Sequence, residues 1–497
     1  MSAPSTSSAS ASSSTAPDMT WQTSYDVLIV GAGIAGSALA HALTTSTAST
    51  SRAKPLRVAL LERSFAEPDR IVGELLQPGG WDALRALGLE DCVEEIDSIP
   101  VRGYAVVKDG SAVRIPYTNQ HEGRSFHHGR FVQRLREKAK AAPGVDAIEA
   151  TVTTLVECPF SGRIIGVQAR RTGAEEPEPF YADLVVVADG CFSNFRTQVY
   201  KAKPRTNLIS HFVGLILTDA QLPIPNHGTV CLVHGHGPVL LYQIGTHDTR
   251  MLVDVKAPLP ADLQKHIATE ILPQLPAALH LPIQAALDAD RIRRMPNTFL
   301  AAAEQGGKST KEGVILLGDA WNMRHPLTGG GMTVAFHDVQ LLTPQLLALK
   351  DLNDWDAVSH MLHRWHWARK PLGATVNVLS VALYQLFGAD DEYLSVLKDG
   401  CFAYFEKGGK CVDEPVELLS AVRADLWLLF YHFFSVAFYS IYIMFTRPRL
   451  VSAPGDKPVY AVPRVDEYPA LALKSFFVFW TACTVFGPLL WTEVRWW

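Results

Sequence analysis

The sequence predicts an α/β protein in which a sheet-rich segment interrupts a nucleotide-binding domain and a helical, apolar region follows. Three observations support this class. A short apolar strand pattern at 25–30 runs into a glycine string at 31–36, strand-like segments separated by turn residues fill 201–300, and two long apolar stretches follow residue 425. A strand, a glycine loop and a helix in succession are typical of α/β folds, whereas consecutive strands indicate a separate sheet.

Composition excludes several classes of protein. The chain has 497 residues, 48% of them apolar, which is enough for two or three domains with buried cores. Its net charge is −5 and it has no basic block, so we expect no nucleic-acid partner. The seven cysteines are scattered and no pair has CxxC spacing, so we predict no metal site, no disulfides and a reducing, cytosol-facing environment.

Two low-complexity stretches lie near the N-terminus. Residues 1–22 are rich in Ser, Thr and Ala. They lack a basic start followed by an apolar core, so we interpret them as a disordered tail and not as a signal peptide. Residues 44–54 have a similar composition and are expected to form a loop insertion between a helix and a strand.

The glycine string GAGIAG stands between a strand pattern and a helical pattern. In this context GxGxxG spacing predicts a Rossmann-like dinucleotide-binding domain. Gly31 makes the tight turn, Gly33 lets a pyrophosphate approach the backbone, and Gly36 lets the helix pack on the sheet. The phosphates are expected at the helix N-terminus, where backbone N–H groups are free.

The end of the second strand pattern carries the acid expected in such a domain. Residues 57–61 end at Glu62 and Arg63. An acid here binds the ribose hydroxyls of the adenosine, usually about 20 residues after the glycines. Glu62 lies 26 residues beyond Gly36, and the inserted loop accounts for the excess. We therefore expect an unphosphorylated ribose, as in FAD or NAD, with a solvated glutamate as the alternative.

Two further strand patterns end in an aspartate beside a glycine. One ends at Asp189, and a second, at 314–317, ends at Asp319. Three glycines, the last of them Gly331, then precede a helix that begins at Met332. Such a helix start presents free N–H groups and a partial positive charge to a ligand. Plain turns are the alternative.

Other polar candidates carry less information. Tyr104 lies on a strand pattern, where a tyrosine more often packs than reacts. His127 and His128 are adjacent and have no acidic or cysteine partner at ligand spacing, so they do not predict a metal site. Arg130 follows at a helix start, where its forked guanidinium suits a phosphate.

The remaining patterns suggest how the chain is divided. Strands are predicted at 208–216, 229–233, 239–244 and 250–255, and a helical segment at 260–287. The expected domains are a tail (1–22), a first part of the nucleotide-binding domain (23–200) that includes substrate-domain strands at about 98–128, a substrate-binding sheet domain (201–300), a second part of the nucleotide-binding domain (301–345), and a helical membrane-anchoring region (346–497).

The C-terminal part contains two candidate membrane segments. Residues 426–445 carry no formal charge, and 471–491 are similarly apolar. Each is long enough to cross a bilayer as a helix. Arg447 and Arg449 between them, and Arg495 with two tryptophans at the end, suit interfacial anchors. Spanning helices, a hairpin lying in one leaflet, and buried helices of a large core all fit this pattern.

Four elements point to one kind of cofactor site: the GAGIAG string, Glu62-Arg63, Asp189-Gly190, and Gly318-Asp319 with its glycines. No other GxGxxG follows a strand, so no separate NADPH domain is expected. The arrangement resembles the FAD-binding monooxygenases of the para-hydroxybenzoate hydroxylase fold. The strings RIVGELLQPGG, HHGRF, VVADGCFSNFR and GDAWNMRHPLTGGGMTVAF, with the apolar C-terminal pair, narrow the resemblance to the squalene monooxygenase (squalene epoxidase) family over residues 25–495.

The resemblance implies FAD, O2 and an NADPH-cytochrome P450 reductase as electron donor. It implies epoxidation of squalene to (3S)-2,3-oxidosqualene, for sterol (ergosterol-type) biosynthesis, through a flavin C4a-hydroperoxide. An alkene has no proton to remove, so such a site needs an apolar, water-excluding cavity and no His or Ser dyad. The expected location is the endoplasmic reticulum membrane, with the catalytic domain facing the cytosol and lipid droplets as a second location. Attachment is expected through the C-terminal helices.

The resemblance also assigns residues. Asp319 is expected to accept a hydrogen bond from a ribityl hydroxyl, and the helix after Gly331 to face the flavin N1–C2=O edge. Tyr104 matches a tyrosine of the substrate cavity and is the one catalytic candidate. Trp321 and Phe402 are candidates for a squalene channel, with core packing as the alternative. The positions that match FAD contacts are Ile34, Ala35, Glu62, Arg63, Arg70, Leu75 (where a Phe is expected in animal enzymes), Arg130, Val152, Asp319 and Met332.

Two alternatives stay open. The first is another flavoenzyme on the same fold, such as an aromatic hydroxylase or an isoprenoid reductase, although these lack the C-terminal pair or the MRHPLTGGGM string. The second is a non-catalytic binder on a flavoprotein-like fold, such as a prenyl-Rab carrier. The intact phosphate glycines and Asp319 argue against that class.

Overall fold

The computed structural model describes residues 25–47, 54–201, 204, 206–388, 391–450 and 460–493. The predicted N-terminal tail, most of the predicted loop insertion at 44–54, and the terminal Arg495 with its two tryptophans lie outside these residues.

A parallel sheet forms the nucleotide-binding part. Its strand order is β8, β2, β1, β10 and β16, with every neighbouring pair parallel. The strands are rich in buried Val, Ile and Leu, as expected where helices cover a parallel sheet. β9 joins β8 and β10 by antiparallel pairing where these strands extend beyond the sheet. The bounds are β1 Tyr25–Val30, β2 Val58–Glu62, β8 Val145–Glu157, β9 Ile164–Arg171, β10 Glu178–Val187 and β16 Val314–Leu316.

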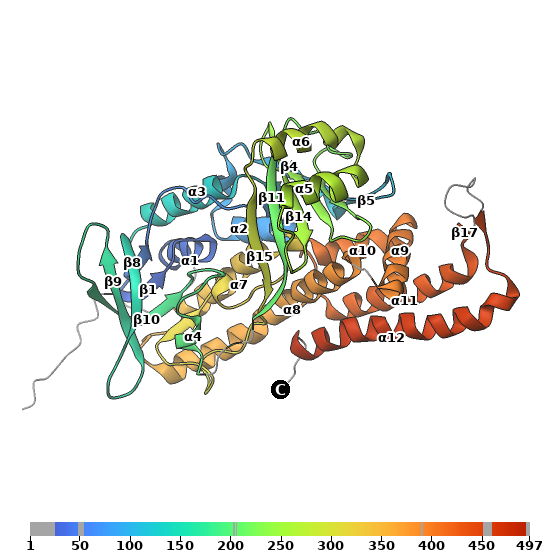
Figure 1. The fold of residues 1–497 in the computed structure, drawn as a ribbon. Coiled ribbons are helices and arrows are strands. Elements are labelled where there is room, and N and C mark those ends of the chain that lie inside the picture. Colours follow the sequence, from blue (N-terminus) through green and yellow to red (C-terminus); the bar gives the residue numbers. More distant parts are fainter. Residues whose placement is uncertain are drawn as a thin grey trace, which may run out of the picture.

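Helices pack on this sheet close to its ligand-facing edge. α1 (Ile34–Thr45) follows β1 directly and packs against α3 (His128–Ala141) and α7 (Gly331–Leu347). α2 (Pro78–Ala86) packs on α7 so closely that a Cβ at Gly80 would clash with Thr333. In Figure 1 these helices lie between the parallel sheet and the second sheet.

The second sheet has seven strands in the order β15-β11-β14-β13-β12-β5-β6. Its residues alternate between two faces. Met251 and Val253 point to a core shared with α5 (Leu263–His266) and α6 (His280–Asp288), whereas Leu252 points to the opposite, cavity-side cluster. The bounds are β5 Gly103–Lys108, β6 Ser111–Pro116, β11 Asn207–Thr218, β12 Gly228–Cys231, β13 Val239–Gln243, β14 Asp248–Val255 and β15 Arg293–Phe299; β3 Leu75–Leu76, β4 Ile99–Val101 and β7 Gly123–Ser125 form a small third sheet.

The strands predicted between 208 and 255 are confirmed. One prediction needs correction, and one strand was not predicted. The segment predicted at 260–287 is helical from Leu263 onward but is not one continuous helix: a π-helical turn and two 3-10 turns separate α5 from α6. Pro273 and Pro276 lie at the break, and proline removes the N–H that a continuous helix needs. β15 was not predicted, because its sequence RRMPNTF has no alternating apolar pattern.

The C-terminal helices are α8 (Trp355–Phe387), α9 (Glu392–Glu406), α10 (Lys410–Leu419), α11 (Leu426–Thr446) and α12 (Tyr468–Glu493). α11 and α12 lie side by side and project from the body, with the start of α11 and the end of α12 at the body (Figure 1).

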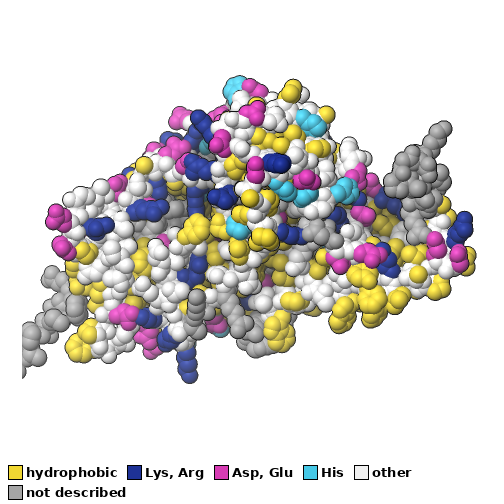
Figure 2. All heavy atoms as spheres, in the orientation of Figure 1, with side chains coloured by type: hydrophobic (Ala, Val, Ile, Leu, Met, Phe, Trp, Pro, Cys, Tyr) yellow, Lys and Arg dark blue, Asp and Glu magenta, His cyan; other side chains and the backbone are white. Residues whose placement is uncertain are grey.

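Both projecting helices are long and apolar enough to cross a membrane. Only 28% of the most apolar 18-residue stretch of α11, and 22% of that of α12, is buried. The interpretation of the two segments as helices of a large core is therefore wrong. Exposed large side chains such as Trp427, Phe438, Phe476 and Trp480 cover them. Figure 2 shows apolar side chains along the underside of this projection. The pair is therefore suited to contact lipid.

Candidate active site

A partly open cavity with about 1450 Å³ of empty space lies between the two sheets. One end is formed by backbone and polar groups at the ends of β1, β10 and β16, including Gly33, Gly190 and Asp319. The other end is formed by apolar side chains of the second sheet and the adjoining loops, including Leu240 and Leu252. The cavity thus joins a polar end and an apolar end without an intervening wall.

The first glycine turn, Gly31–Gly36, opens α1 at the polar end. Gly31 has φ +103°, and a Cβ there would clash with the carbonyl of Ala188. A Cβ at Gly36 would overlap the carbonyl oxygen of Gly31, whereas one at Gly33 would enter open space. The turn is therefore closely packed behind and open in front, as a pyrophosphate at a helix N-terminus requires.

Two side chains brace this turn from outside. Glu62 Oε2 accepts a hydrogen bond from the backbone N–H of Ala32 at 2.8 Å. Arg136, on α3, donates from Nε to the carbonyl oxygen of Ala32 at 2.8 Å and from Nη1 to that of Ala66 at 2.8 Å. Arg136 was not singled out in the sequence, because an arginine inside a helix gives no local signal of a distant carbonyl partner.

Arg196 ties the two aspartate loops together. Its Nη2 donates to the carbonyl oxygens of Asp319 at 2.8 Å and Cys191 at 3.2 Å, and its Nε donates to that of Ala320 at 2.7 Å. Asp189 accepts from the N–H of Asn194 at 2.9 Å, while its Oδ1 is buried without a partner among the described residues. Burial raises the pKa of Asp189.

The second glycine turn, Thr328–Gly331, opens α7 on the same cavity. Gln77 Nε2 donates to the carbonyl oxygen of Thr328 at 2.7 Å and also to the hydroxyl of Tyr104. Tyr104 donates to the same Thr328 oxygen at 3.1 Å, and Tyr117 donates to Gln77 Oε1 at 2.7 Å. Burial raises the pKa of Tyr104, so its hydroxyl stays protonated and holds the turn.

Buried polar pairs support the apolar end. Arg250 donates to both carboxylate oxygens of Glu74, at 2.7 and 2.8 Å, and Tyr242 donates to Glu74 at 3.3 Å. Glu74 is 1% exposed. The pair fixes the segment before β3 to strand β14, and its geometry satisfies both charges.

His325, in the loop before the second glycine turn, is also held by buried contacts. Its Nε2 lies 3.1 Å from Ser210 Oγ, and its ring stacks on Tyr384 with centroids 4.1 Å apart. Ser210 in turn donates to Asp254. These contacts anchor the loop that carries Pro326 and Leu327 into the cavity wall.

A second cavity, with about 770 Å³ of empty space, lies among α8 to α12. Cys401, Leu386 and Phe405 line it. They belong to the same apolar cluster as Tyr104 and Leu327 of the first cavity. One apolar cluster thus contributes side chains to the walls of both cavities.

The structure brings about half of the predicted cofactor residues to the first cavity. Gly33, Ile34, Ala35, Arg70, Leu75, Asp319, Gly331 and Met332 line it, together with Tyr104. Gly31, Gly36, Glu62, Arg63, Arg130, Val152 and Asp189 lie outside its wall.

The residues outside the wall have other surroundings. Gly31, Gly36 and Glu62 shape the first turn from behind. Arg130 donates to the carbonyl oxygen of Ile96 at 3.4 Å and does not reach the cavity. Val152 lies on β8 and packs against the core of the parallel sheet.

The two channel candidates line neither cavity. Trp321 is fully buried and stacks on Trp365, with ring centroids 4.7 Å apart, so the core-packing alternative applies to it. Phe402 packs against the apolar cluster between the cavities.

The polar end fits a flavin dinucleotide. Two helix N-termini, those of α1 and α7, open on one cavity with no side chain where a Cβ at Gly33 or Gly331 would stand. Asp319 supplies an acceptor for a hydroxyl group between them. A ligand with a pyrophosphate, a hydroxylated linker and a flat electron-accepting ring matches this set of groups.

Comparisons with known proteins agree with this geometry. The family model described as squalene epoxidase matches residues 181–455. A squalene epoxidase of Aspergillus fumigatus is 44% identical over 485 residues, which cover 94% of this chain and 93% of that protein. The squalene monooxygenase of Mus musculus is 41% identical over 481 residues, covering 95% of this chain and 78% of that protein.

Solved structures show the same fold at low identity. PqsL, a probable FAD-dependent monooxygenase from Pseudomonas aeruginosa, has a TM-score of 0.59 and 22% identity, covering 73% of this chain and 96% of that chain. A variant of HpxO from Klebsiella pneumoniae, complexed with FAD, has a TM-score of 0.60 and 18% identity, covering 80% of this chain and 99% of that chain.

Proposed function

Because the chain belongs to the squalene epoxidase family, we propose that it epoxidises squalene to (3S)-2,3-oxidosqualene for sterol biosynthesis. The protein is an FAD-dependent monooxygenase, and O2 is its second substrate. The observation that carries the proposal is the first cavity, which places an apolar surface directly beside a dinucleotide-binding end.

FAD is proposed to lie along the polar end. Its pyrophosphate would approach Gly33 at the start of α1, and a ribityl hydroxyl would donate to Asp319. The flavin ring would face the N-terminus of α7 at Gly331 and Met332, whose free N–H groups favour the negative charge of reduced flavin. Glu62 is proposed to bind the adenosine ribose, for which its Oε1 remains available beside the Ala32 contact.

The bound flavin supplies the oxygen chemistry. The chain's own residues do the rest. Leu240, Leu252 and Leu327 form apolar walls that exclude water, and the ring of Tyr104 borders the place where the terminal alkene would meet the flavin. An alkene gives up no proton on epoxidation, so the mechanism asks for positioning and not for a general base. The hydroxyl of Tyr104 is occupied in holding the second turn, which favours a substrate-positioning role over a catalytic one.

The second cavity gives room for the rest of the hydrocarbon. Its lining joins the apolar cluster of the first cavity, so movement of a few apolar side chains would connect the two. The domain division predicted from the sequence remains part of this proposal: the second sheet and the C-terminal helices would hold squalene, and the parallel sheet would hold FAD.

Membrane association is proposed through α11 and α12, at the endoplasmic reticulum with the catalytic body on the cytosolic side. The exposed apolar surface of both helices supports this placement. An NADPH-cytochrome P450 reductase is the proposed electron donor, since only one GxGxxG string follows a strand in the sequence.

The test is detergent-solubilised protein with FAD, NADPH, a P450 reductase and squalene, analysed for oxidosqualene by mass spectrometry. One atom of labelled O2 should appear in the product. Reactions without reductase or without squalene serve as controls. If flavin is bound and reduced but no epoxide forms, the protein is a different flavoenzyme of this fold; if the purified protein takes up no flavin, the monooxygenase mechanism fails as well.

A further inference from the structure

The C-terminal end of α12 reaches a buried polar network beside the second glycine turn. Glu493, the last described residue of this largely apolar helix, is 5% exposed. Its Oε2 accepts a hydrogen bond from Nδ2 of Asn377, on α8, at 3.2 Å. Its Oε1 has no partner among the described residues. A buried carboxylate with one satisfied oxygen is unfavourable for folding by itself, so its presence needs an explanation.

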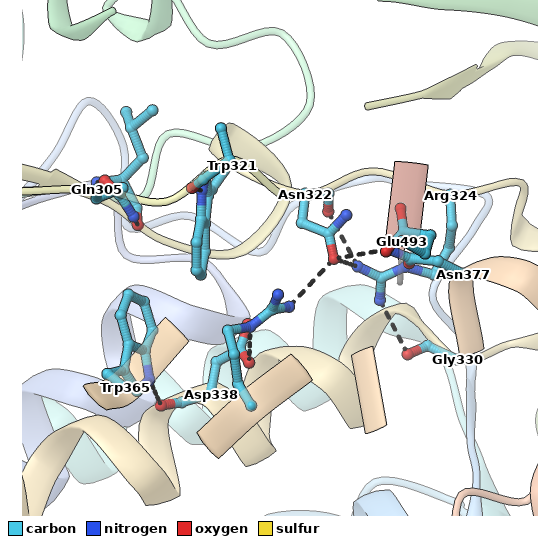
Figure 3. A network of polar contacts seen from close by, with 12 residues as sticks. Gln305, Trp321, Asn322, Arg324, Gly330, Asp338, Trp365, Asn377 and Glu493 are labelled. Atoms are coloured by element: carbon cyan, nitrogen blue, oxygen red, sulfur yellow. Dashed lines mark hydrogen bonds and ion pairs between the residues drawn. The ribbon is translucent and has the colours of Figure 1, made fainter. Parts of the chain in front are cut away.

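A chain of side chains leads from Glu493 to the turn. Asn377 Nδ2 also lies 3.4 Å from Oδ1 of Asn322, and Arg324 Nη2 donates to that same oxygen at 2.7 Å. Arg324 Nη1 then donates to the carbonyl oxygen of Gly330 at 3.3 Å. Figure 3 shows these residues converging from α12, α8 and the loop before α7. Three side chains thus separate Glu493 from the residue that caps α7.

Charge explains why a carboxylate is needed there. Arg369 is paired with Asp338 at 2.6 Å, and both are buried. Arg324 has no carboxylate within 4.0 Å in the part of the chain that the structure describes, and burial lowers its pKa to about 10. Asp319, Asp338 and Glu493 favour its charged form from a greater distance, whereas the charge of Arg369 disfavours it. Glu493 is therefore one of three carboxylates that help to offset a buried positive charge lining the first cavity.

Packing brings the same elements together. A Cβ at Gly330 would overlap Val376 Cγ1 on α8, one residue before Asn377. The start of α7 consequently rests directly on the part of α8 that binds Glu493. A shift of α12 away from α8 would take the Glu493 carboxylate away from Asn377. The positive charge of Arg324 would then be less well balanced by nearby negative charge.

We propose that Glu493 is a positioning residue of the flavin site, which holds Arg324 and through it the second glycine turn in the geometry that accepts FAD. The flavin site is then complete only when α12 is docked on α8, so a candidate membrane helix contributes to cofactor binding. This inference rests on the proposed placement of FAD at the N-terminus of α7.

The test compares two substitutions in the full-length, detergent-solubilised protein, stripped of flavin and titrated with FAD. Glu493→Ala removes the acceptor and the charge, and should raise the FAD dissociation constant by about tenfold or more, the size expected for a buried hydrogen bond to a charged group. Glu493→Gln keeps an acceptor for Asn377 and should bind FAD within about threefold of wild type. It should raise the flavin midpoint potential, because the less compensated Arg324 stabilises reduced, anionic flavin. Asp466→Ala, at an exposed carboxylate before α12, is the matched control and should change neither quantity.

A purely structural role would lower the melting temperature of both Glu493 variants without changing FAD affinity or potential, and that result would overturn the proposal. If Glu493→Ala does not fold, Asn377→Ser interrupts the same chain from α8 and should show the same loss of FAD affinity. Wild-type affinity in that variant would again contradict the inference. A wild-type protein that takes up no FAD would overturn both this inference and the proposed function, whereas normal FAD binding by all variants overturns the inference alone.

Discussion

The two glycine turns at the cavity are alike in role but differ in what holds them. The first, at the start of α1, depends on close backbone packing: Gly31 packs against Ala188 and Gly36 against Gly31. The side chains of Glu62 and Arg136 add hydrogen bonds to Ala32 from outside. The second, at the start of α7, is held by side chains from distant elements, Gln77 from the start of α2 and Arg324 from the preceding loop.

The difference determines which substitutions would disrupt each turn. A turn fixed by backbone packing fails when a glycine gains a side chain. A turn fixed by a buried polar network fails when any member of the network is lost, because the remaining groups stay buried without partners.

The largest effect is expected at the first turn. Gly36→Ala should lower the free energy of unfolding by about 3 kcal/mol or more, because the new Cβ overlaps the carbonyl oxygen of Gly31. Gly33→Ala is the matched control, since its Cβ enters open space: the melting temperature should hold while FAD affinity falls. Melting temperature and flavin absorbance per protein measure the two effects. If Gly36→Ala and Gly33→Ala had the same melting temperature, close backbone packing would not be what holds the first turn.

The second turn should respond to Gln77→Leu. Tyr117 loses its acceptor and the Thr328 carbonyl loses a donor, so the free energy of unfolding should fall by about 2–4 kcal/mol. Chemical unfolding followed by tryptophan fluorescence measures this loss. A Gln77→Leu protein as stable as wild type would mean that the network does not hold the turn.

A smaller effect, on ligand and not on fold, is expected for Asp319→Ala. The structure gives its carboxylate no hydrogen-bond partner among the described residues, so the melting temperature should change little. FAD should bind about tenfold more weakly if the carboxylate accepts from the ribityl chain. Equilibrium titration with FAD checks this, and unchanged occupancy would refute the role proposed for Asp319.

The smallest effect is a pH dependence at the segment before β3, where His128 contacts Gly73. His128 holds the carbonyl of Gly73 at 2.8 Å, and burial lowers its pKa from 6.5 to about 4. The unfolded chain takes up this proton below pH 6.5 and the folded protein does not until about pH 4, so stability falls as pH falls through this window. Between pH 7 and 5.5 the contribution is about 1 kcal/mol.

His128→Gln should remove that part of the pH dependence while keeping a donor for Gly73. Melting curves at pH 7 and 5.5 provide the comparison. Parallel pH profiles in wild type and variant would show that His128 does not titrate as its burial indicates.

The sequence predicted the parts of the site that depend on local pattern. The GxGxxG turn, the strand end at Asp319 and the glycines before α7 all follow from residues adjacent in the chain. The braces did not, because each joins residues far apart: Arg136 reaches Ala32, and Arg196 reaches Asp319. No spacing in one sequence reports such a pairing.

The elements of the fold likewise differ in whether local sequence predicts them. The apolar strands of the parallel sheet were predictable from their short runs of apolar residues bounded by turn residues. β15 pairs along β11 with a polar, proline-containing sequence, so tertiary pairing overrides its local preference. The apolar stretches after residue 425 were predictable as helices, but only the structure shows that the end of α12 returns to the body.

The return of α12 has a consequence for how the protein would respond to different lipids. α11 has 21 residues and is about 31 Å long, close to the thickness of a bilayer's hydrocarbon core. Glu493 fixes one end of the hairpin to the catalytic body, whereas the ends at Thr446 and Tyr468 lie at its far tip (Figure 1). Hydrophobic mismatch would then be absorbed at the tip, by tilt or by local thinning, and the cofactor end would keep its geometry in membranes of different thickness.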